Sequence, residues 1–185
     1  MKGIVFFDVD TQYDFMKPRG KLYVKGAEKI IPNLKKLTRF ADKHKIVIIS
    51  SLDAHIKRDP EFKIFPAHCV RNTSGAAKIK ETYGLKTRQV FIHKRTFDVF
   101  SNPMTKKVLS KFNPAYVYGV ALDYCVKAAC LGLVHLGIKT YLVQDATKAV
   151  SPKGGLQTLK LLKAKGVVFI NTKDIIKGGR LWKRE

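Results

Sequence analysis

Acidic residues are scarce in this chain, where 14 Asp and Glu stand against 36 Lys and Arg in 185 residues, a formal net charge of +22. Only three cysteines are present, too few for a disulfide framework. No apolar run approaches the roughly 18 residues of a membrane span, so we expect no membrane partner. The first apolar stretch is too short for a secretory signal, which predicts a cytoplasmic protein.

Repeats, low-complexity tracts and linkers are also missing, so we predict a single domain over residues 1–185. Apolar residues make up 45 % of the chain, which excludes a disordered protein. The lysines are spread along the whole sequence, and no signature of a nucleic-acid-binding fold is visible. This pattern favours a generally basic, solvated surface over a nucleic-acid partner.

Six short segments rich in β-branched and aromatic residues are nearly continuous in apolarity, as strands buried on both faces should be. They cover residues 4–7, 46–49, 90–92, 116–118, 141–143 and 167–170. Segments with helical spacing lie between them, at 27–43, 104–112, 124–136 and 156–164. The alternation predicts an α/β fold, in which a six-stranded, mainly parallel sheet lies between two helical layers (α/β/α).

Reactive residue types follow the predicted strands, where the carboxyl ends of an open α/β sheet form the ligand crevice. Six of the 14 acidic residues fall within 8–14 and 53–61, after the first and second strands. The third strand is followed by His93, Lys94 and Arg95, and the fourth leads into Cys125. We therefore expect one site at this edge of the sheet.

Cys125 lies where the fourth strand meets a predicted helix, whose N-terminal dipole favours a thiolate. Lys94 would supply a cation that lowers the pKa of the thiol further, and Asp10 would accept its proton as a general base. Cys130, on the same helix, is interpreted as a buried core residue. The sequence thus predicts a nucleophile, a cation and a base from three different strands.

Four motifs in this order resemble those of the isochorismatase-like cysteine hydrolases of the nicotinamidase type. They are FDVDTQYDF at 7–15, DAH at 53–55 with FPAH at 65–68, the lysine at 94, and GVALDYCV at 119–126. The resemblance implies a catalytic triad of Asp10, Lys94 and Cys125. It also implies a cis peptide bond before Ala121 and an oxyanion hole made by the backbone N–H groups of Ala121 and Cys125. Leu122 departs from the family pattern, which leaves Asp123 as the expected helix cap.

The resemblance further implies a metal held by the second of these motifs and the loop between its two parts, with the ligand set Asp53, His55, Glu61 and His68. Asp59 is the alternative to Glu61. Mixed imidazole and carboxylate ligands suit one divalent Zn, Fe or Mn ion, and no organic cofactor is expected. In the family, aromatic residues at the positions of Phe15 and Phe65 enclose the substrate ring.

These features predict a metal-containing cysteine amidase with a small-molecule amide substrate. The most specific expectation is a nicotinamidase, which converts nicotinamide and water into nicotinate and ammonia through a Cys125 thioester. A hydrolase of another amide or of an N-carbamoyl compound is the first alternative, and a basic polyanion-binding protein is the second. Relatives also lead us to expect a homo-oligomer.

Overall fold

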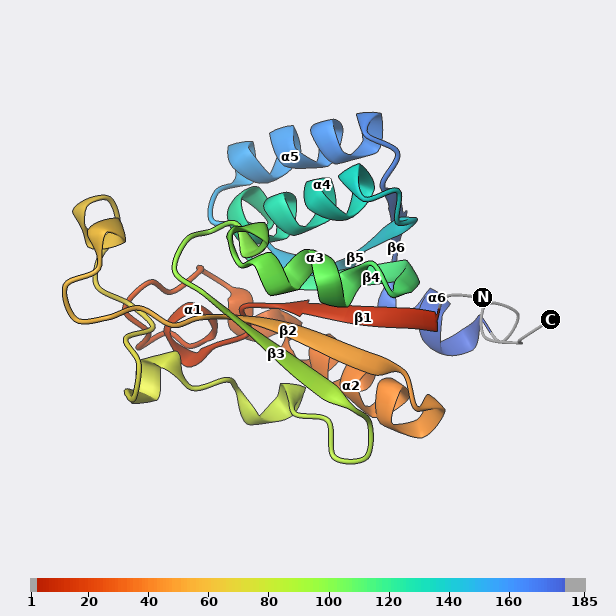
Figure 1. Cartoon of the computed structure of the whole chain (residues 1–185), viewed down its shortest axis with the longest axis horizontal. Helices are drawn as coiled ribbons and strands as arrows, with labels where there is room; N and C mark the ends of the chain where they lie inside the picture. The colour runs from red at the N-terminus through yellow and green to blue at the C-terminus, as the bar shows by residue number, and fades with distance from the viewer. Residues whose placement is uncertain (1–2, 179–185) are drawn as a thin grey trace.

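A sheet of six parallel strands runs through the molecule, which is described over residues 3–178 in a computed structural model (Figure 1). The strand order is β3-β2-β1-β4-β5-β6. The strands are β1 (Gly3–Val9), β2 (Val47–Asp53), β3 (Gln89–Lys94), β4 (Phe112–Val120), β5 (Thr140–Lys148) and β6 (Val168–Ile170). The predicted fold class is confirmed, and the sheet is wholly rather than mainly parallel.

Helices cover both faces of this sheet, as Figure 1 shows. One face carries α2 (Ile31–His44) and α6 (Thr172–Lys177), and the other carries α3 (Pro103–Leu109), α4 (Lys127–His135) and α5 (Pro152–Ala164). The short helix α1 (Tyr13–Met16) follows β1. Two of these helices, α1 and α6, were not predicted, because each is too short to show a periodic apolar pattern.

Local capping explains where the longer helices begin. The helix predicted at 156–164 starts at Pro152, because the Ser151 side chain accepts a hydrogen bond from the backbone N–H of Gly154 and Pro fits the first helical position. The predicted helix at 27–43 is instead a 3-10 turn (Ala27–Ile30) followed by α2. The predicted strands and helices are therefore present with shifted ends.

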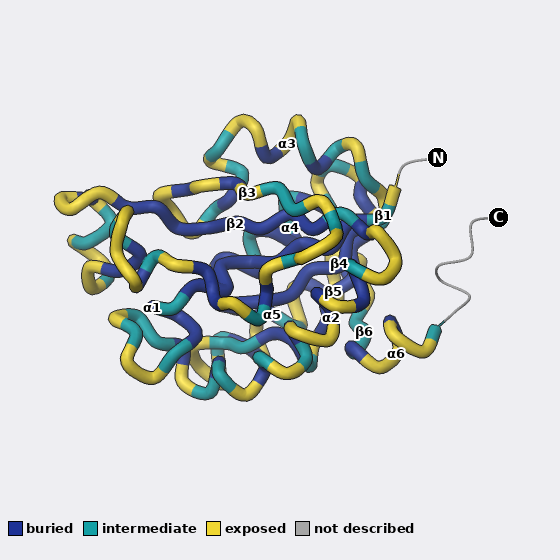
Figure 2. The backbone as a smooth tube through the Cα atoms, turned by 90° about the horizontal axis from the view of Figure 1, so that it is seen from below, coloured by how far each residue is buried: buried dark blue, intermediate teal, exposed yellow. Residues whose placement is uncertain are grey.

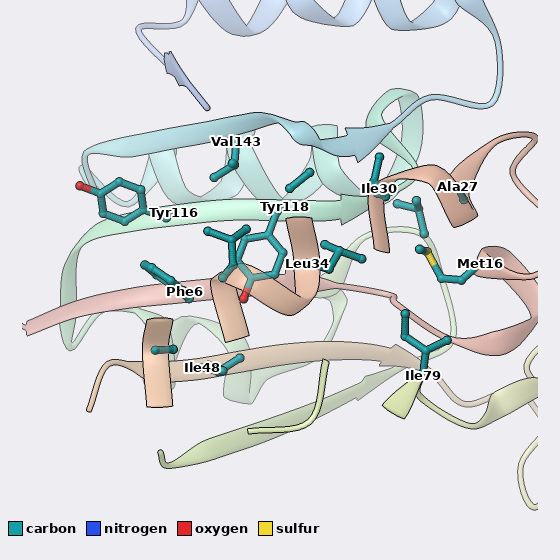
Figure 3. Packing of buried hydrophobic residues seen from close by; sticks show 14 of the residues in the cluster. Phe6, Met16, Ala27, Ile30, Leu34, Ile48, Ile79, Tyr116, Tyr118 and Val143 are labelled. Atoms are coloured by element: carbon teal, nitrogen blue, oxygen red, sulfur yellow. The ribbon is translucent and has the colours of Figure 1, made fainter. Parts of the chain in front are cut away.

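The core consists of two apolar layers on either side of β1 and β4, which are buried along most of their length (Figure 2). Phe6, Tyr118 and Leu34 belong to the layer beneath α2, which Figure 3 shows from close by. Phe7 and Val117 belong to the opposite layer, beneath α4. No helix among residues 3–178 has both the length and the apolarity to cross a membrane.

The strand order places β1 and β4 side by side where the direction of chain progress through the sheet reverses. In doubly wound α/β folds, the carboxyl ends of the strands at such a point form the ligand crevice. Asp10 directly follows β1, and Ala121 directly follows β4. The fold therefore places two of the predicted site residues on opposite sides of this crevice.

Candidate active site

Asp10, Lys94 and Cys125 meet at the carboxyl end of the sheet, although 84 residues separate the first two in sequence. Lys94 Nζ lies 2.8 Å from Asp10 Oδ2 and 3.6 Å from Cys125 Sγ. All three residues are buried. The structure thus brings together the nucleophile, base and cation that the sequence analysis predicted.

Two contacts with β2 fix the orientation of the Asp10 carboxylate. The Ser51 hydroxyl donates a hydrogen bond of 2.6 Å to Asp10 Oδ1, and the backbone N–H of Asp10 donates to the Ser51 carbonyl. Asp10 has φ = +50°, a left-handed conformation that Asp adopts more readily than most residues. The second carboxylate oxygen, Oδ2, is left to face Lys94.

Burial dominates the acid–base behaviour of this triad. It raises the pKa of the Cys125 thiol well above its ordinary value, and the Lys94 ammonium offsets only part of that effect. Lys94 lowers the pKa of this thiol, as expected, but the net shift is upward because removal of the sulfur from water disfavours the thiolate more than one cation favours it. Burial also raises the pKa of Asp10, against the effect of Lys94. These directions suit a neutral thiol that loses its proton during the reaction.

The segment that carries Cys125 is a π-helical turn, Leu122–Val126, between β4 and α4. The Ala121 carbonyl accepts hydrogen bonds from the backbone N–H groups of Tyr124 and Val126, which closes this turn. The peptide bond between Val120 and Ala121 is cis, as the resemblance implied. Ala121 and Cys125 both line the pocket described below.

Asp123 does not cap this turn, contrary to our expectation. Its carboxylate accepts hydrogen bonds from the backbone N–H groups of Val150 and Ser151, because the side chain reaches across to the loop that leads into α5. The residue at the cap position is Ala121, which has no side chain able to accept a hydrogen bond. Asp123 therefore connects the Cys125 turn to a neighbouring loop.

Four further predicted residues converge beside the triad. Asp53 ends β2, Glu61 lies in the 3-10 turn Pro60–Lys63, and His55 and His68 belong to the adjoining loop. Asp53 Oδ2 lies 3.7 Å from His55 Nε2 and 3.5 Å from His68 Nε2. Glu61 Oε2 lies 3.9 Å from the same Nε2 of His55.

Unpartnered polar atoms show that these residues fit a divalent metal. His55 Nε2, His55 Nδ1 and Glu61 Oε2 are buried and have no hydrogen-bond partner within residues 3–178. His68 Nδ1 lies 2.7 Å from the Pro66 carbonyl oxygen, which only accepts, so Nδ1 carries a proton and Nε2 is the ring nitrogen that faces Asp53. Two imidazole nitrogens and two carboxylates are a donor set that suits Zn, Fe or Mn.

The geometry also separates Glu61 from its rival Asp59. The ligand atoms of Asp53, His55 and His68 lie within 4.8 Å of one another, and those of His55, Asp59 and Glu61 form a second such group. Glu61 approaches Nε2 of His55, the nitrogen that faces Asp53, whereas Asp59 Oδ2 lies 3.2 Å from Nδ1 on the other side of the ring.

Asp53 belongs to both halves of the site. Its Oδ1 is ion-paired with Lys94 Nζ, while its Oδ2 faces the two imidazoles. Burial alone would raise the pKa of Asp53, but the neighbouring Lys94 ammonium is the main opposing effect and holds that pKa well below its usual range. The triad and the candidate metal ligands therefore share one ionised carboxylate.

Two polar residues after β1 hold this arrangement in place. Gln12 clamps the backbone of Asp53: its Nε2 donates to the Asp53 carbonyl, and its Oε1 accepts from the Asp53 N–H. Asp14 accepts from the backbone N–H of Cys69, next to His68. The sequence analysis placed Gln12 and Asp14 beyond the first strand but assigned them no role, since backbone clamping leaves no pattern in a single sequence.

A pocket of about 230 Å³ opens beside Cys125. Phe15 and Phe65 line it, as predicted, and Phe65 lies 5.9 Å from the Tyr124 ring in a near-perpendicular arrangement. The sequence analysis missed most of the apolar wall, which comes mainly from loops, with one residue from the end of β4 and one from the π-helical turn. The missed residues are Leu22, Tyr23, Val24, Phe97, Val120, Tyr124 and Val150.

Comparison with known proteins gives consistent matches across the chain. Residues 5–174 match the model of the isochorismatase domain. The chain is 30 % identical to a nicotinamidase of Acinetobacter baylyi over 91 % of this chain and 92 % of that one, and 29 % identical to a nicotinamidase of Saccharomyces cerevisiae over 77 % and 87 %. The solved structure of a pyrazinamidase of Pyrococcus horikoshii in complex with zinc superposes with a TM-score of 0.84 at 29 % identity, covering 91 % of this chain and 98 % of that one.

Proposed function

Because the chain belongs to the isochorismatase family and is an amide-hydrolysing enzyme of the nicotinamidase type, we propose that it is a metal-containing nicotinamidase. The reaction would convert nicotinamide and water into nicotinate and ammonia. One observation carries this proposal: Cys125, Asp53, Glu61 and His68 line the same apolar pocket. A flat heteroaromatic amide needs such apolar walls with few polar groups.

Asp10 and Cys125 carry out the first half of the reaction. Asp10 takes the proton from Cys125 Sγ as the sulfur attacks the amide carbon, which forms a C–S bond. The negative charge moves to the amide oxygen, where the backbone N–H groups of Ala121 and Cys125 stabilise it. The C–N bond then breaks as Asp10 returns its proton to the nitrogen, so that ammonia leaves and a thioester remains.

Water completes the reaction by hydrolysing the thioester, again with Asp10 as the base. Asp10 accepts a proton from water as its oxygen adds to the thioester carbon. The C–S bond breaks, and the sulfur of Cys125 recovers the proton from Asp10 as nicotinic acid leaves and ionises to nicotinate by losing its own proton to solvent. Lys94 stays protonated throughout, since its two buried carboxylate neighbours help to raise its pKa well above the ordinary value against the opposing effect of burial.

The metal would be held by Asp53, His55, Glu61 and His68, and the zinc complex of the pyrazinamidase relative supports a divalent ion. When bound, such an ion would offer the ring nitrogen of the substrate a coordination position and so orient the amide toward Cys125. Phe15 and Phe65 would enclose the ring between them and exclude water from its faces.

Ammonia release by the purified protein tests this proposal. We expect turnover of nicotinamide and pyrazinamide that falls on treatment with a chelator and returns on addition of Zn²⁺. Benzamide, which lacks the ring nitrogen, should be a poor substrate whose hydrolysis responds little to the chelator. Full-rate hydrolysis of nicotinamide by metal-free protein would remove the metal from the proposal. Faster turnover of N-carbamoyl compounds would favour the alternative substrate class.

A further inference from the structure

The two ring nitrogens of His55 face different carboxylates. Nε2 points toward Asp53 and Glu61, the candidate metal ligands, whereas Nδ1 lies 3.2 Å from Asp59 Oδ2. A histidine that binds a metal through one nitrogen carries its proton on the other. In this site the acceptor within reach of that proton is Asp59.

Asp59 is built into its loop far more firmly than its neighbours. It is 6 % exposed, while Arg58 and Pro60 on either side are exposed. Arg95, the residue after Lys94, donates a hydrogen bond of 2.8 Å from Nε to Asp59 Oδ2. A carboxylate in a solvated surface turn would not need such an anchor from a separate strand.

The same carboxylate also holds the turn that carries Glu61. Asp59 occupies the N-cap of this 3-10 turn (Pro60–Lys63), and its Oδ1 accepts a hydrogen bond of 3.2 Å from the backbone N–H of Glu61. One side chain is therefore in contact with one candidate ligand through its ring and with another through its backbone.

We infer that Asp59, anchored by Arg95, is a positioning residue that orients both His55 and Glu61 toward the metal. This inference rests on the proposed function, because it assumes a metal at this site. Metal-bound imidazoles generally donate their second N–H to a carboxylate or carbonyl group, and loss of that outer partner weakens metal binding about 10- to 100-fold. Asp59 Oδ2, 3.2 Å from Nδ1, is placed to become this partner for His55, and Asp59 Oδ1 already holds the backbone N–H of Glu61.

Affinity for Zn²⁺, measured by competition with a chromophoric chelator, tests the inference without relying on activity. We expect Asp59→Ala to weaken Zn²⁺ binding by about 10- to 100-fold. Asp59→Asn should weaken it as well, because an amide offers one acceptor and one donor group where two acceptors are needed. Arg95→Ala should lower the affinity less, since Asp59 remains. Arg58→Ala removes the same charge from the exposed neighbour and should leave the affinity unchanged.

Spectra of the Co²⁺-substituted protein separate positioning from direct ligation. Asp59→Ala should keep the absorption bands of the wild type, because the ligand set is intact, whereas Glu61→Ala should change them. Wild-type affinity in Asp59→Ala and Arg95→Ala would overturn the inference alone, and altered bands in Asp59→Ala would overturn it by making Asp59 a ligand. A wild type that binds no Zn²⁺ would overturn both the inference and the proposed metal. If Asp59→Ala fails to fold, Asp59→Asn and Arg95→Ala decide the matter.

Discussion

Replacement of Lys94 by Met should destabilise the protein severely while it removes activity. Lys94 is buried and is the cation that both Asp10 and Asp53 contact, at 2.8 Å for Asp10 Oδ2. Loss of one partner from a buried ion pair costs about 3–5 kcal/mol, because it leaves a buried charge without compensation. A typical domain is stable by only about 5–15 kcal/mol, so the variant should lose a large share of its stability.

The pH dependence gives this prediction its sign. In the wild type the pKa of Lys94 is raised in the folded state. Its contribution to the free energy of unfolding is therefore fully present below its ordinary pKa of 10.5 and is lost only as the pH rises above that value. Without Lys94, burial should raise the pKa of both Asp10 and Asp53 above the ordinary 3.8. Folding of the variant then takes up protons. The difference in free energy of unfolding between wild type and variant should therefore shrink as the pH falls from 7 toward 4.

Urea unfolding of chelator-treated protein at pH 7 and pH 4.5 measures both effects. Lys106→Met, at an exposed helical position, is the matched control and should differ little from the wild type. A Lys94→Met variant as stable as this control at pH 7, or a deficit that does not change with pH, would refute the charge-compensation argument. Substantial turnover of nicotinamide by Lys94→Met would refute its role in the triad.

Cys125→Ala should abolish ammonia release while Cys130→Ala keeps most of it, because only Cys125 lines the pocket; turnover by Cys125→Ala in a standard kinetic assay would contradict a thioester route. Phe65→Ala should weaken binding of the substrate ring by about 1–3 kcal/mol, measured by calorimetry with nicotinate, and an unchanged Kd would remove it from the ring site. Glu61→Gln should stabilise the metal-free protein by about 0.5–2 kcal/mol while it weakens Zn²⁺ binding, and a loss of stability in chelator-treated samples would speak against this. Binding of random duplex DNA should be weak and vanish at moderate salt, whereas salt-resistant binding would revive the polyanion hypothesis.

The sequence predicted the sheet well because its central strands are buried on both faces. A continuous apolar run such as 46–49 is accommodated best in a strand that is buried on both faces. Four of the six predicted segments lie wholly within strands, and those at 46–49 and 167–170 each begin one residue before their strand. The helix ends were less accurate, since they depend on single capping bonds such as that of Ser151. The predicted homo-oligomer and the single-domain extent over 1–185 stay predictions.

The sequence predicted which residues meet at the site wherever they lie at or soon after the end of a strand. Asp10, Lys94 and Cys125 come together because parallel strands end at one edge of the sheet, whatever their separation in sequence. The pKa of Cys125 was not predictable in this way, because burial is a property of the folded chain and it outweighs the cation that sequence order places nearby. The prediction that Asp123 caps its own turn failed for a similar reason, because its actual partners, the backbone N–H groups at 150–151, are brought near only by folding.

Four carboxylates at or near the site are paired with Lys or Arg, whereas Asp14 and Asp123 accept backbone N–H groups instead. Asp8 pairs with Lys78, Asp10 and Asp53 share Lys94, and Asp59 pairs with Arg95. Within residues 3–178, no Lys or Arg forms an ion pair with Glu61, whose nearest partner is the His55 imidazole at 3.9 Å. Burial and the nearby Asp53 raise the pKa of Glu61, so metal-free protein gains stability from this group as the pH falls toward 4.5. Glu61 is thus a buried acceptor without a Lys or Arg partner in the part of the chain that the structure describes, and this observation supports its place among the proposed metal ligands.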